Sequence, residues 1–430
     1  MQFASSMRVV RIEQFGGPEV LLEEMVEVPT PGAGEMLVRN QAAGVNPVDY
    51  KIRAGLYPAV RQSQLPYVPG RDVSGIVVQR GPGAARYVIG DAVFAMPGID
   101  RGGYTEYVLV REDEAAPRPN ALDAVAAGAV PLAALTAWQG LFRHGGLQQG
   151  QSVLIQGGSG GVGHFAIQFA KAKGAHVATT VSGRNLAFAR ELGADKVIDY
   201  EAQRFEEEVA DVDMVFDLVG GDTQERSWRV LKTGGVLVST LAKPSEEKAA
   251  ERAARGMRYT VEESGADLAE ITQLIDSGQV KPVIARIFPL EEAAAAQQFL
   301  EKEHPAEKPA CCELTRWRAA LRGSERPSSI GADFRPRQRR HGLRRRTCRG
   351  NKWASSASRE EVERVNPASV PWRPADQEGR RLSPHVILRR EVRRPRCSRP
   401  GSRTRNTANS PPRATCPTAF SPFPSSERNR

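Results

Sequence analysis

A glycine-rich loop carries the clearest chemical signal in the sequence: Gly158-Ser159-Gly160-Gly161-Val162-Gly163. The apolar run Val153–Gln156 precedes this loop and a helical pattern follows it at once, which is the context that a dinucleotide-binding G-x-G-x-x-G loop requires. We expect Gly158 to allow the tight turn, Gly160 to let the backbone approach a pyrophosphate, and Gly163 to let the helix pack on the sheet. Helix N–H groups would then hold the phosphates. The alternative is a glycine-rich turn without function.

The end of the next strand-like run indicates which dinucleotide binds. An NAD site places an acidic residue about 20 residues after the loop, on the ribose 2′-hydroxyl. Residues 175–190 contain no acid, and the run ends in Ser182-Gly183-Arg184. A hydroxyl and a guanidinium suit a 2′-phosphate. The sequence therefore predicts NADP(H), with a solvated loop containing an ordinary arginine as the alternative.

Metal ligands are scarce in the first 310 residues. The five cysteines all lie later in the chain: Cys311, Cys312, Cys348, Cys397 and Cys416. Residues 1–310 therefore offer no thiolate ligand and no disulfide. Three of their four histidines, at 144, 164 and 176, lack ligand spacing, and we expect them to be core or surface residues. No metal site is expected.

Two kinds of element would position these residues. From Met7 to Arg118, short β-rich runs alternate with Gly and Pro, which is typical of a small irregular β-barrel. From Asp123, strand-length apolar runs alternate with helical segments such as Phe165–Lys173 and Asn185–Leu192, which end at Gly174 and Gly193. This alternation predicts an α/β domain with a doubly wound parallel sheet. The expected strands are Arg8–Ile12, Glu35–Asn40, Ser74–Gln79, Ala92–Ala95, Tyr104–Val110, Val153–Gln156, His176–Val181, Lys196–Asp199, Met214–Leu218 and Val236–Thr240.

The chain changes character near Pro305. Before it, a helix at Asp267–Ser277, a strand-like Pro282–Phe288 and a helix at Leu290–Glu301 could return to the first domain. After it, residues 311–430 contain 28 Arg, 1 Lys and 10 acids, so this segment carries +19 and residues 1–310 carry −9. A segment with this much charge cannot bury enough apolar surface to offset the entropy lost on ordering. We expect residues 306–430 to be a disordered, basic tail.

Five ordered motifs resemble the medium-chain dehydrogenase/reductase superfamily, in particular its zinc-free NADPH:quinone oxidoreductase and alkenal reductase branch. They are Gly44-Val45-Asn46-Pro47-Val48-Asp49-Tyr50-Lys51, Pro69-Gly70-Arg71-Asp72-Val73-Ser74-Gly75, Leu135-Thr136-Ala137-Trp138, the loop at 158–163, and Leu192-Gly193-Ala194-Asp195 followed by Ile198-Asp199-Tyr200. The resemblance runs from Met7 to about Pro305 and implies a GroES-like catalytic domain at 7–122, completed by about 267–305. A Rossmann NADP-binding domain at 123–266 lies between them. In this family Gly-Lys and a last strand usually follow the Pro305 region; here Pro309 would obstruct a central strand, and the arginine-rich tail suggests out-of-frame translation.

The resemblance also implies roles for single residues. Asn46, Lys51 and Thr136 match positions at the nicotinamide end, and Ser182, Arg184 and Tyr200 match positions that hold the adenosine 2′-phosphate and ribose. Lys51 could stabilise the anion that develops on the substrate, or be a solvated lysine. Tyr50 could donate a proton, although packing is the commoner role of a loop tyrosine. Asp49 is expected to be a structural partner of Arg53 or Arg71.

Zinc-dependent cousins place a cysteine where this chain has Asn46 and a histidine where it has Arg71. The resemblance therefore implies a zinc-independent enzyme that reduces a quinone or an enone, because a conjugated acceptor needs no Lewis acid. Three alternatives stay open: a zinc alcohol dehydrogenase, an NADP-binding redox sensor and a nucleic-acid-binding protein. The tail has few aromatics for base stacking. We expect a cytoplasmic homodimer that binds a small-molecule substrate and neither membrane nor specific nucleic acid.

Overall fold

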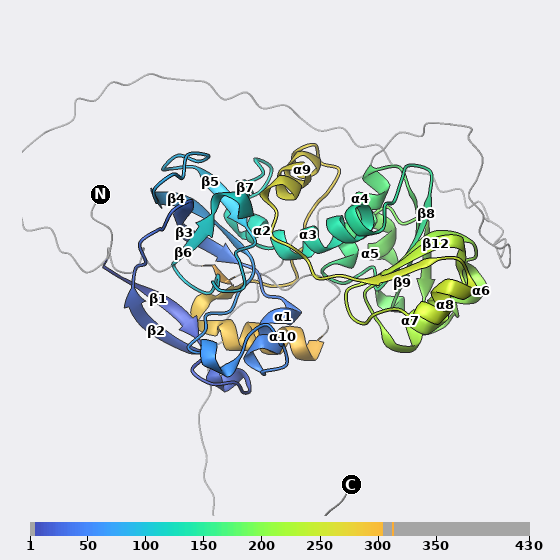
Figure 1. Ribbon diagram of the computed structural model, residues 1–430, viewed down its shortest axis with the longest axis horizontal. Coiled ribbons are helices and arrows are strands. Elements are labelled where there is room, and N and C mark those ends of the chain that lie inside the picture. Colours follow the sequence, from blue (N-terminus) through green and yellow to red (C-terminus); the bar gives the residue numbers. More distant parts are fainter. Residues whose placement is uncertain (1–4, 304–311, 314–430) are drawn as a thin grey trace, which may run out of the picture. The chain divides into compact units, whose positions relative to one another are not determined.

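The computed structural model describes residues 5–303 together with the backbone of Cys312 and Glu313 (Figure 1). All of them lie in the first of two compact units of the chain, Met1–Ala375. Within this described part, no helix is both long and apolar enough to cross a membrane. The expectation of a disordered tail concerns residues that lie outside the described part, apart from residues 312 and 313.

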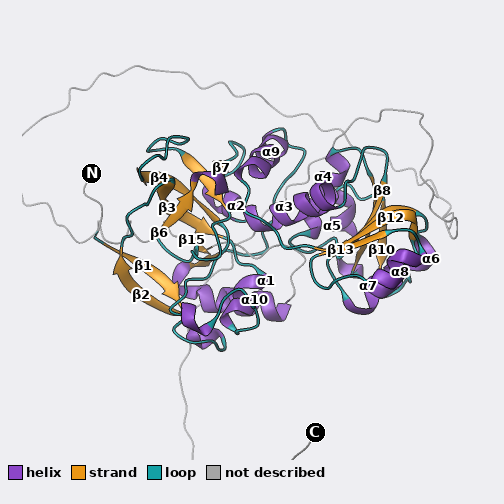
Figure 2. Ribbon diagram, viewed as in Figure 1, coloured by secondary structure: helices purple, strands orange, loops and turns teal. Residues whose placement is uncertain are grey.

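The first domain is built on antiparallel strands, which Figure 2 shows on one side of the picture. Its strands are β1 (Ser6–Arg11), β2 (Leu22–Glu27), β3 (Glu35–Ala43), β4 (Val73–Arg80), β5 (Ala92–Ala95), β6 (Tyr107–Arg111) and β7 (Ala115–Pro117). Alternate residues of β3 and β4, such as Met36, Val38 and Val77, fill one core. In the hairpin β1–β2 only β1 was predicted, because β2 is largely exposed and carries three glutamates.

The second domain contains a six-stranded parallel sheet. Its strands are β8 (Ser152–Gln156), β9 (His176–Val181), β10 (Lys196–Asp199), β11 (Val212–Asp217), β12 (Leu231–Ser239) and β13 (Arg255–Arg258). Their order is β10-β9-β8-β11-β12-β13, the order of a Rossmann fold. The predicted doubly wound sheet is confirmed, and the two strands beside the glycine loop end where expected. Edge strand β13 was missed because it has two arginines and a glycine beside its one apolar residue, Met257, and so shows no apolar run.

Helices cover both faces of the parallel sheet (Figure 1). Val153 and Ile155 of β8 pack on one face with Phe165 of α4, whereas Leu154 packs on the other face with Trp228, beyond the end of α7. This alternation explains why the buried strands read as continuous apolar runs. The helices are α4 (Gly163–Ala172), α5 (Leu186–Glu191), α6 (Phe205–Glu208), α7 (Gly221–Ser227) and α8 (Glu246–Glu251). Gly174 and Gly193, with φ of 77° and 99°, end α4 and α5 as predicted.

Further helices connect the two domains and complete the first. They are α1 (Pro47–Arg53), α2 (Ala124–Gly128), α3 (Pro131–Trp138), a π-helical turn (Gln139–His144), α9 (Gly265–Asp276) and α10 (Ala293–Glu303). Helix α9 packs on β7, and α10 packs on α1. Arg53 of α1 donates hydrogen bonds to Gln297 at 3.0 Å and Glu301 at 3.0 Å in α10. The segment after residue 265 therefore returns to the first domain.

The last described residues add short strands to the first domain. The expected strand Pro282–Phe288 is reduced to β14 (Phe288–Pro289) and an isolated bridge at Ile284. Strand β15 (Cys312–Glu313) lies between β14 and β3. A two-residue strand thus forms inside the range that the sequence assigned to a structureless tail. Single 3₁₀ turns lie at Pro18–Val20, Gln62–Gln64, Glu112–Glu114, Gly183–Asn185 and Leu290–Glu292.

Candidate functional site

The glycine loop joins β8 to α4 through closely packed backbone. The residue with positive φ is Gly157, at 82°, and so Gly157 rather than Gly158 permits the tight turn. A Cβ on Gly158 would lie 2.0 Å from Thr179 Oγ1, and one on Gly163 would lie 2.2 Å from the carbonyl oxygen of Gly157. Both glycines are therefore needed for packing. A Cβ on Gly160 would meet only that same carbonyl oxygen, at 3.5 Å.

The loop has the donors that a pyrophosphate requires. The N–H groups of Ser159, Gly161 and Val162 donate to no other described residue, whereas the N–H of Gly160 is bonded to Gly157 at 3.2 Å. These free N–H groups stand at the start of α4, where the helix dipole favours an anion. The open space at Gly160 lies in the same loop. The loop therefore fits a dinucleotide phosphate group.

The three predicted 2′-phosphate residues lie at one edge of the sheet. Ser182 directly follows β9, and Tyr200 follows the neighbouring β10, where its N–H donates to Val181 at 3.1 Å. The Tyr200 side chain is 58% exposed. Arg184 is exposed, and its guanidinium forms no bond or ion pair with any residue in the described ranges. The edge thus combines a buried hydroxyl, an exposed phenol and a cation that has no partner in the described ranges.

Asn185 connects this edge to the glycine loop. Its Nδ2 group donates to Ser182 Oγ at 3.0 Å and to Ser159 Oγ at 3.2 Å. The sequence interpretation gave Asn185 no role, because a side-chain bond between two separate loops leaves no local sequence signal. It connects the glycine loop to the sheet edge at Ser182.

Asn46 is buried at the start of α1. Its backbone N–H donates to Asp49 Oδ2 at 2.7 Å, and its side-chain Nδ2 donates to Asp72 Oδ2 at 2.7 Å. Gly44 makes room for this arrangement, because a Cβ there would lie 2.2 Å from Asp72 Oδ2. The Asp72 carboxylate therefore fixes the orientation of the Asn46 amide.

Asp72 also links Asn46 to Thr136. Its other oxygen accepts the N–H of Leu132 at 2.5 Å, and the carbonyl of Leu132 accepts the Thr136 hydroxyl at 2.7 Å. The Tyr259 hydroxyl donates to the Thr136 carbonyl from the far side. Two predicted nicotinamide residues thus belong to one bonded cluster. Asp72 and Tyr259 had no assigned role, since a buried hydrogen-bond relay leaves no sequence signal.

Helix α3 places this cluster beside the phosphate loop's helix. Trp138 at the end of α3 packs edge-on against Phe169 of α4, with ring centroids 5.4 Å apart. Thr136 lies two residues before Trp138 on the same helix. The packing of α3 on α4 therefore connects the cluster of Asn46, Asp72 and Thr136 to the glycine loop.

Asp49 differs from its expected role. It bonds neither Arg53 nor Arg71; its carboxylate accepts from Asn46 N–H, from Gly70 N–H at 3.2 Å and from the Tyr104 hydroxyl at 3.3 Å. Complete burial raises the pKa of Asp49 to about 7, and the nearby Asp72 charge adds to this rise. Asp49 is a structural residue of the α1 start.

Lys51 and Tyr50 lie partly exposed on α1. The Lys51 ammonium has no hydrogen bond or ion pair with the residues that the structure describes. Burial and the Glu301 charge raise the pKa of Tyr50 above its usual value, so the phenol stays protonated at neutral pH. Lys51 can therefore offer a positive charge, and Tyr50 a proton.

Arg71 is buried and holds the two domains' connecting segment. Its Nε donates to the Pro97 carbonyl at 2.9 Å, and its Nη2 pairs with Glu263 at 2.5 Å. In residues 5–303, no three His, Cys, Asp or Glu side chains converge where a metal could bind. Instead of two metal ligands, an amide and a guanidinium occupy positions 46 and 71, each committed to a carboxylate.

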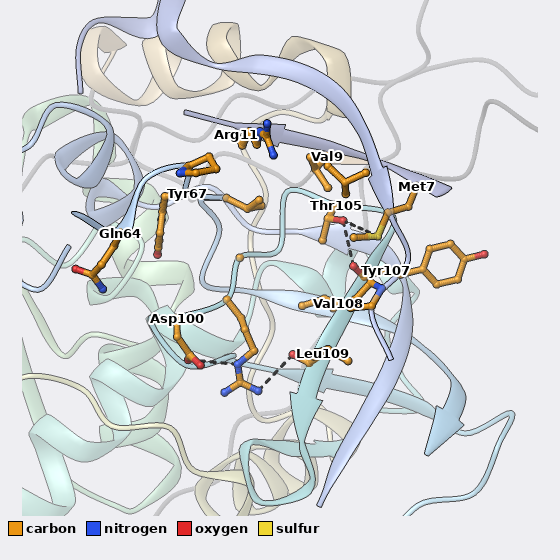
Figure 3. A pocket seen from close by; sticks show the side chains of 16 residues that line it. Met7, Val9, Arg11, Gln64, Tyr67, Asp100, Thr105, Tyr107, Val108 and Leu109 are labelled. Carbon is orange, nitrogen blue, oxygen red and sulfur yellow. Dashed lines mark hydrogen bonds and ion pairs between the residues drawn. The ribbon is translucent and has the colours of Figure 1, made fainter. Parts of the chain in front are cut away.

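Figure 3 shows a pocket of about 590 Å³ on the first domain, under the β1–β2 hairpin. Met7, Val9 and Tyr67 line it with Thr105, whose hydroxyl donates to the Tyr107 carbonyl at 3.0 Å. None of the site residues predicted from the sequence lines this pocket. It is therefore separate from the dinucleotide and nicotinamide-end clusters.

Comparisons with known proteins agree with both halves of this architecture. Residues 32–120 match the family described as alcohol dehydrogenase GroES-like domain. Residues 192–306 match the family described as zinc-binding dehydrogenase. The expected GroES-like and Rossmann combination is thus confirmed.

Three proteins illustrate the similarity over the whole body of the chain. A quinone oxidoreductase of Rattus norvegicus is 33% identical over 311 residues, covering 68% of this chain and 93% of the relative. A chloroplastic NADPH-dependent alkenal/one oxidoreductase of Arabidopsis thaliana is 36% identical over 306 residues, covering 68% and 76%. The structure of the quinone oxidoreductase from Coxiella burnetii matches with a TM-score of 0.67 at 34% identity, covering 72% and 99%.

Proposed function

The chain belongs to the medium-chain dehydrogenase/reductase superfamily of NAD(P)H oxidoreductases, and on this premise we propose that it is a zinc-independent, NADPH-dependent reductase of quinones or α,β-unsaturated carbonyl compounds. Its relatives include proteins named for both substrate classes.

The sheet edge at Ser182, Arg184 and Tyr200, here called the 2′-phosphate edge, supports NADPH as the cofactor. Arg184 is an exposed guanidinium without a partner in the described part of the chain, beside the Ser182 hydroxyl and the exposed Tyr200 phenol. A guanidinium binds phosphate oxygens through charge-assisted hydrogen bonds, about twice as strong as neutral ones. The 2′-hydroxyl of NADH would gain much less from this cation.

The observation that carries zinc independence is the hydrogen bonding of Asn46 and Arg71. The Asn46 amide donates to Asp72, and the Arg71 guanidinium pairs with Glu263. Neither nitrogen is a lone-pair donor that a zinc ion could use, since an amide nitrogen and a guanidinium only donate hydrogen bonds. A saturated alcohol would lose the usual stabilisation of its alkoxide here, whereas a conjugated acceptor would not need it.

When bound, NADPH supplies the hydride, and the acceptor gains this hydride and one proton. Asn46 keeps its Oδ1 and one Nδ2 proton free of Asp72, and so it can both accept and donate at the nicotinamide end. The Thr136 hydroxyl proton is committed to Leu132, which leaves its oxygen as an acceptor.

The reduced acceptor carries negative charge until it is protonated, and α1 offers the groups to manage it. Arg53 is bonded to α10, whereas the Lys51 ammonium has no partner among the described residues and can stabilise this charge. Tyr50 remains protonated at neutral pH and can deliver the proton. Both roles depend on where these two neighbouring residues stand on the short helix α1.

A panel of oxidation assays tests this function. Purified protein would be given NADPH or NADH with 1,4-benzoquinone, with 3-penten-2-one, or, in reverse, NADP⁺ with 1-butanol, before and after treatment with a zinc chelator. We expect NADPH oxidation with at least one conjugated acceptor, no alcohol oxidation, no chelator effect and no stoichiometric zinc. Alcohol oxidation that the chelator abolishes would identify a zinc enzyme instead.

A further inference from the structure

In Rossmann folds, an acid after the second strand of the sheet favours NAD, and residues 175–190 contain none. The structure places an acid there from the neighbouring strand. Asp199 is the last residue of β10 and pairs with Val181, the last residue of β9. It therefore stands next to Ser182 and directly before Tyr200, two of the three residues proposed for the 2′-phosphate.

The Asp199 carboxylate points toward the turn that carries Arg184. A Cβ added to Gly183 would lie 2.7 Å from Asp199 Oδ2, so this oxygen occupies the space that a side chain at 183 would fill. The other oxygen, Oδ1, accepts the N–H of Glu201 at 3.0 Å. Within the described ranges, Oδ2 accepts no hydrogen bond and no cation pairs with the carboxylate. It is a partly exposed, open acceptor.

This oxygen affects the two dinucleotides in opposite ways. A 2′-phosphate carries nearly two negative charges and is repelled by a carboxylate beside it. A ribose 2′-hydroxyl can instead donate a hydrogen bond to the carboxylate, which is how an acid selects NAD in Rossmann folds. Arg184 attracts the 2′-phosphate from the same turn. The preference for NADPH is then the difference between two opposing effects.

We propose that Asp199 is a specificity-determining residue of the dinucleotide site: its carboxylate lowers the preference for NADPH over NADH and allows the protein to bind both. This inference rests on the proposed NADPH-dependent function and concerns the adenosine end of the same site. Gly183 is needed for this arrangement, because any side chain there would displace the Asp199 carboxylate.

Equilibrium binding of adenosine fragments isolates this effect from turnover. The dissociation constants of 2′,5′-ADP and 5′-AMP would be measured by calorimetry with full-length wild type, Asp199→Asn and Asp199→Ser, followed by NADPH and NADH. Both substitutions keep an acceptor for the Glu201 N–H. Glu191→Gln on α5 is the control, since it removes one negative charge from an exposed residue.

We expect Asp199→Asn and Asp199→Ser each to raise the affinity ratio of 2′,5′-ADP to 5′-AMP about tenfold, the effect of a carboxylate near a dianion in a mostly aqueous setting. Glu191→Gln should change the ratio less than about twofold. An unchanged or lowered ratio in both Asp199 variants would overturn the inference while leaving the proposed function intact. If the wild type bound neither NADPH nor NADH, the proposed function and this inference would both be wrong.

Discussion

Asp72 is expected to position Asn46 for catalysis, and Asp72→Asn tests this role with little change in volume. The carboxylate accepts two hydrogen bonds, from Asn46 Nδ2 at 2.7 Å and from the Leu132 N–H at 2.5 Å. Asparagine has only one acceptor oxygen, so one of these donors must face an NH₂ group. Asp72 is fully buried, so bulk water does not reach its carboxylate.

The cost follows from these two bonds. Losing one charge-assisted bond and leaving a buried donor unpaired should lower the free energy of unfolding by about 2–4 kcal/mol. If the unpaired donor is Asn46, its amide turns away from the nicotinamide end. We then expect kcat to fall by about ten- to a hundredfold, with the KM for NADPH changed by less than about threefold, because the phosphate-binding groups are untouched.

Steady-state kinetics with a quinone acceptor and urea denaturation would measure both effects. Glu114→Gln is the matched control: this buried carboxylate accepts from Arg111 N–H at 2.9 Å and from Arg101 at 2.6 Å, within the first domain. It should lose stability without losing kcat. Equal loss of stability with unchanged kcat in both variants would show that Asp72 only supports the fold.

Three further predictions concern the cofactor site and pH. Arg184→Ala should weaken NADPH binding by about ten- to a hundredfold and NADH binding by less than about twofold in fluorescence titrations; equal losses would mean that Arg184 holds the fold or the shared pyrophosphate. Gly160→Ala should keep the thermal unfolding midpoint but weaken the binding of both dinucleotides. Gly163→Ala should instead lower the midpoint, because its Cβ would lie 2.2 Å from the Gly157 carbonyl oxygen. The reverse pattern would contradict this assignment. Burial raises the pKa of Asp49 from 3.8 to about 7, so between these pH values the folded protein holds a proton that the unfolded chain releases. The protonated carboxyl therefore adds stability that is complete below about pH 4 and is lost as pH rises through about 7. The stability difference between wild type and Asp49→Asn should therefore be smaller at pH 8 than at pH 5, by at most about 3 kcal/mol in urea denaturation, and a pH-independent difference would be evidence against it.

The sequence alone determined the Rossmann sheet and the position of the glycine loop between β8 and α4. Buried strands such as Val153–Gln156 are continuous apolar runs, and their ends were predicted within a residue for β8, β9 and β10. Strands β2 and β13 were missed, because exposed edge strands carry charged residues and show no apolar run. Local patterns record burial, and an exposed strand leaves little pattern to find.

Tertiary structure alone decided which side chains meet. Asn46, Asp72 and Thr136 are far apart in sequence, and their hydrogen-bond cluster exists only because β4 and α3 bring Asp72 and Leu132 to the start of α1. The acid at the 2′ edge shows the same limit. The sequence has no acid directly after β9, yet Asp199 reaches that edge from β10, since neighbouring parallel strands end side by side. Sequence spacing measures distance along one strand, whereas the sheet sets the distance between strands.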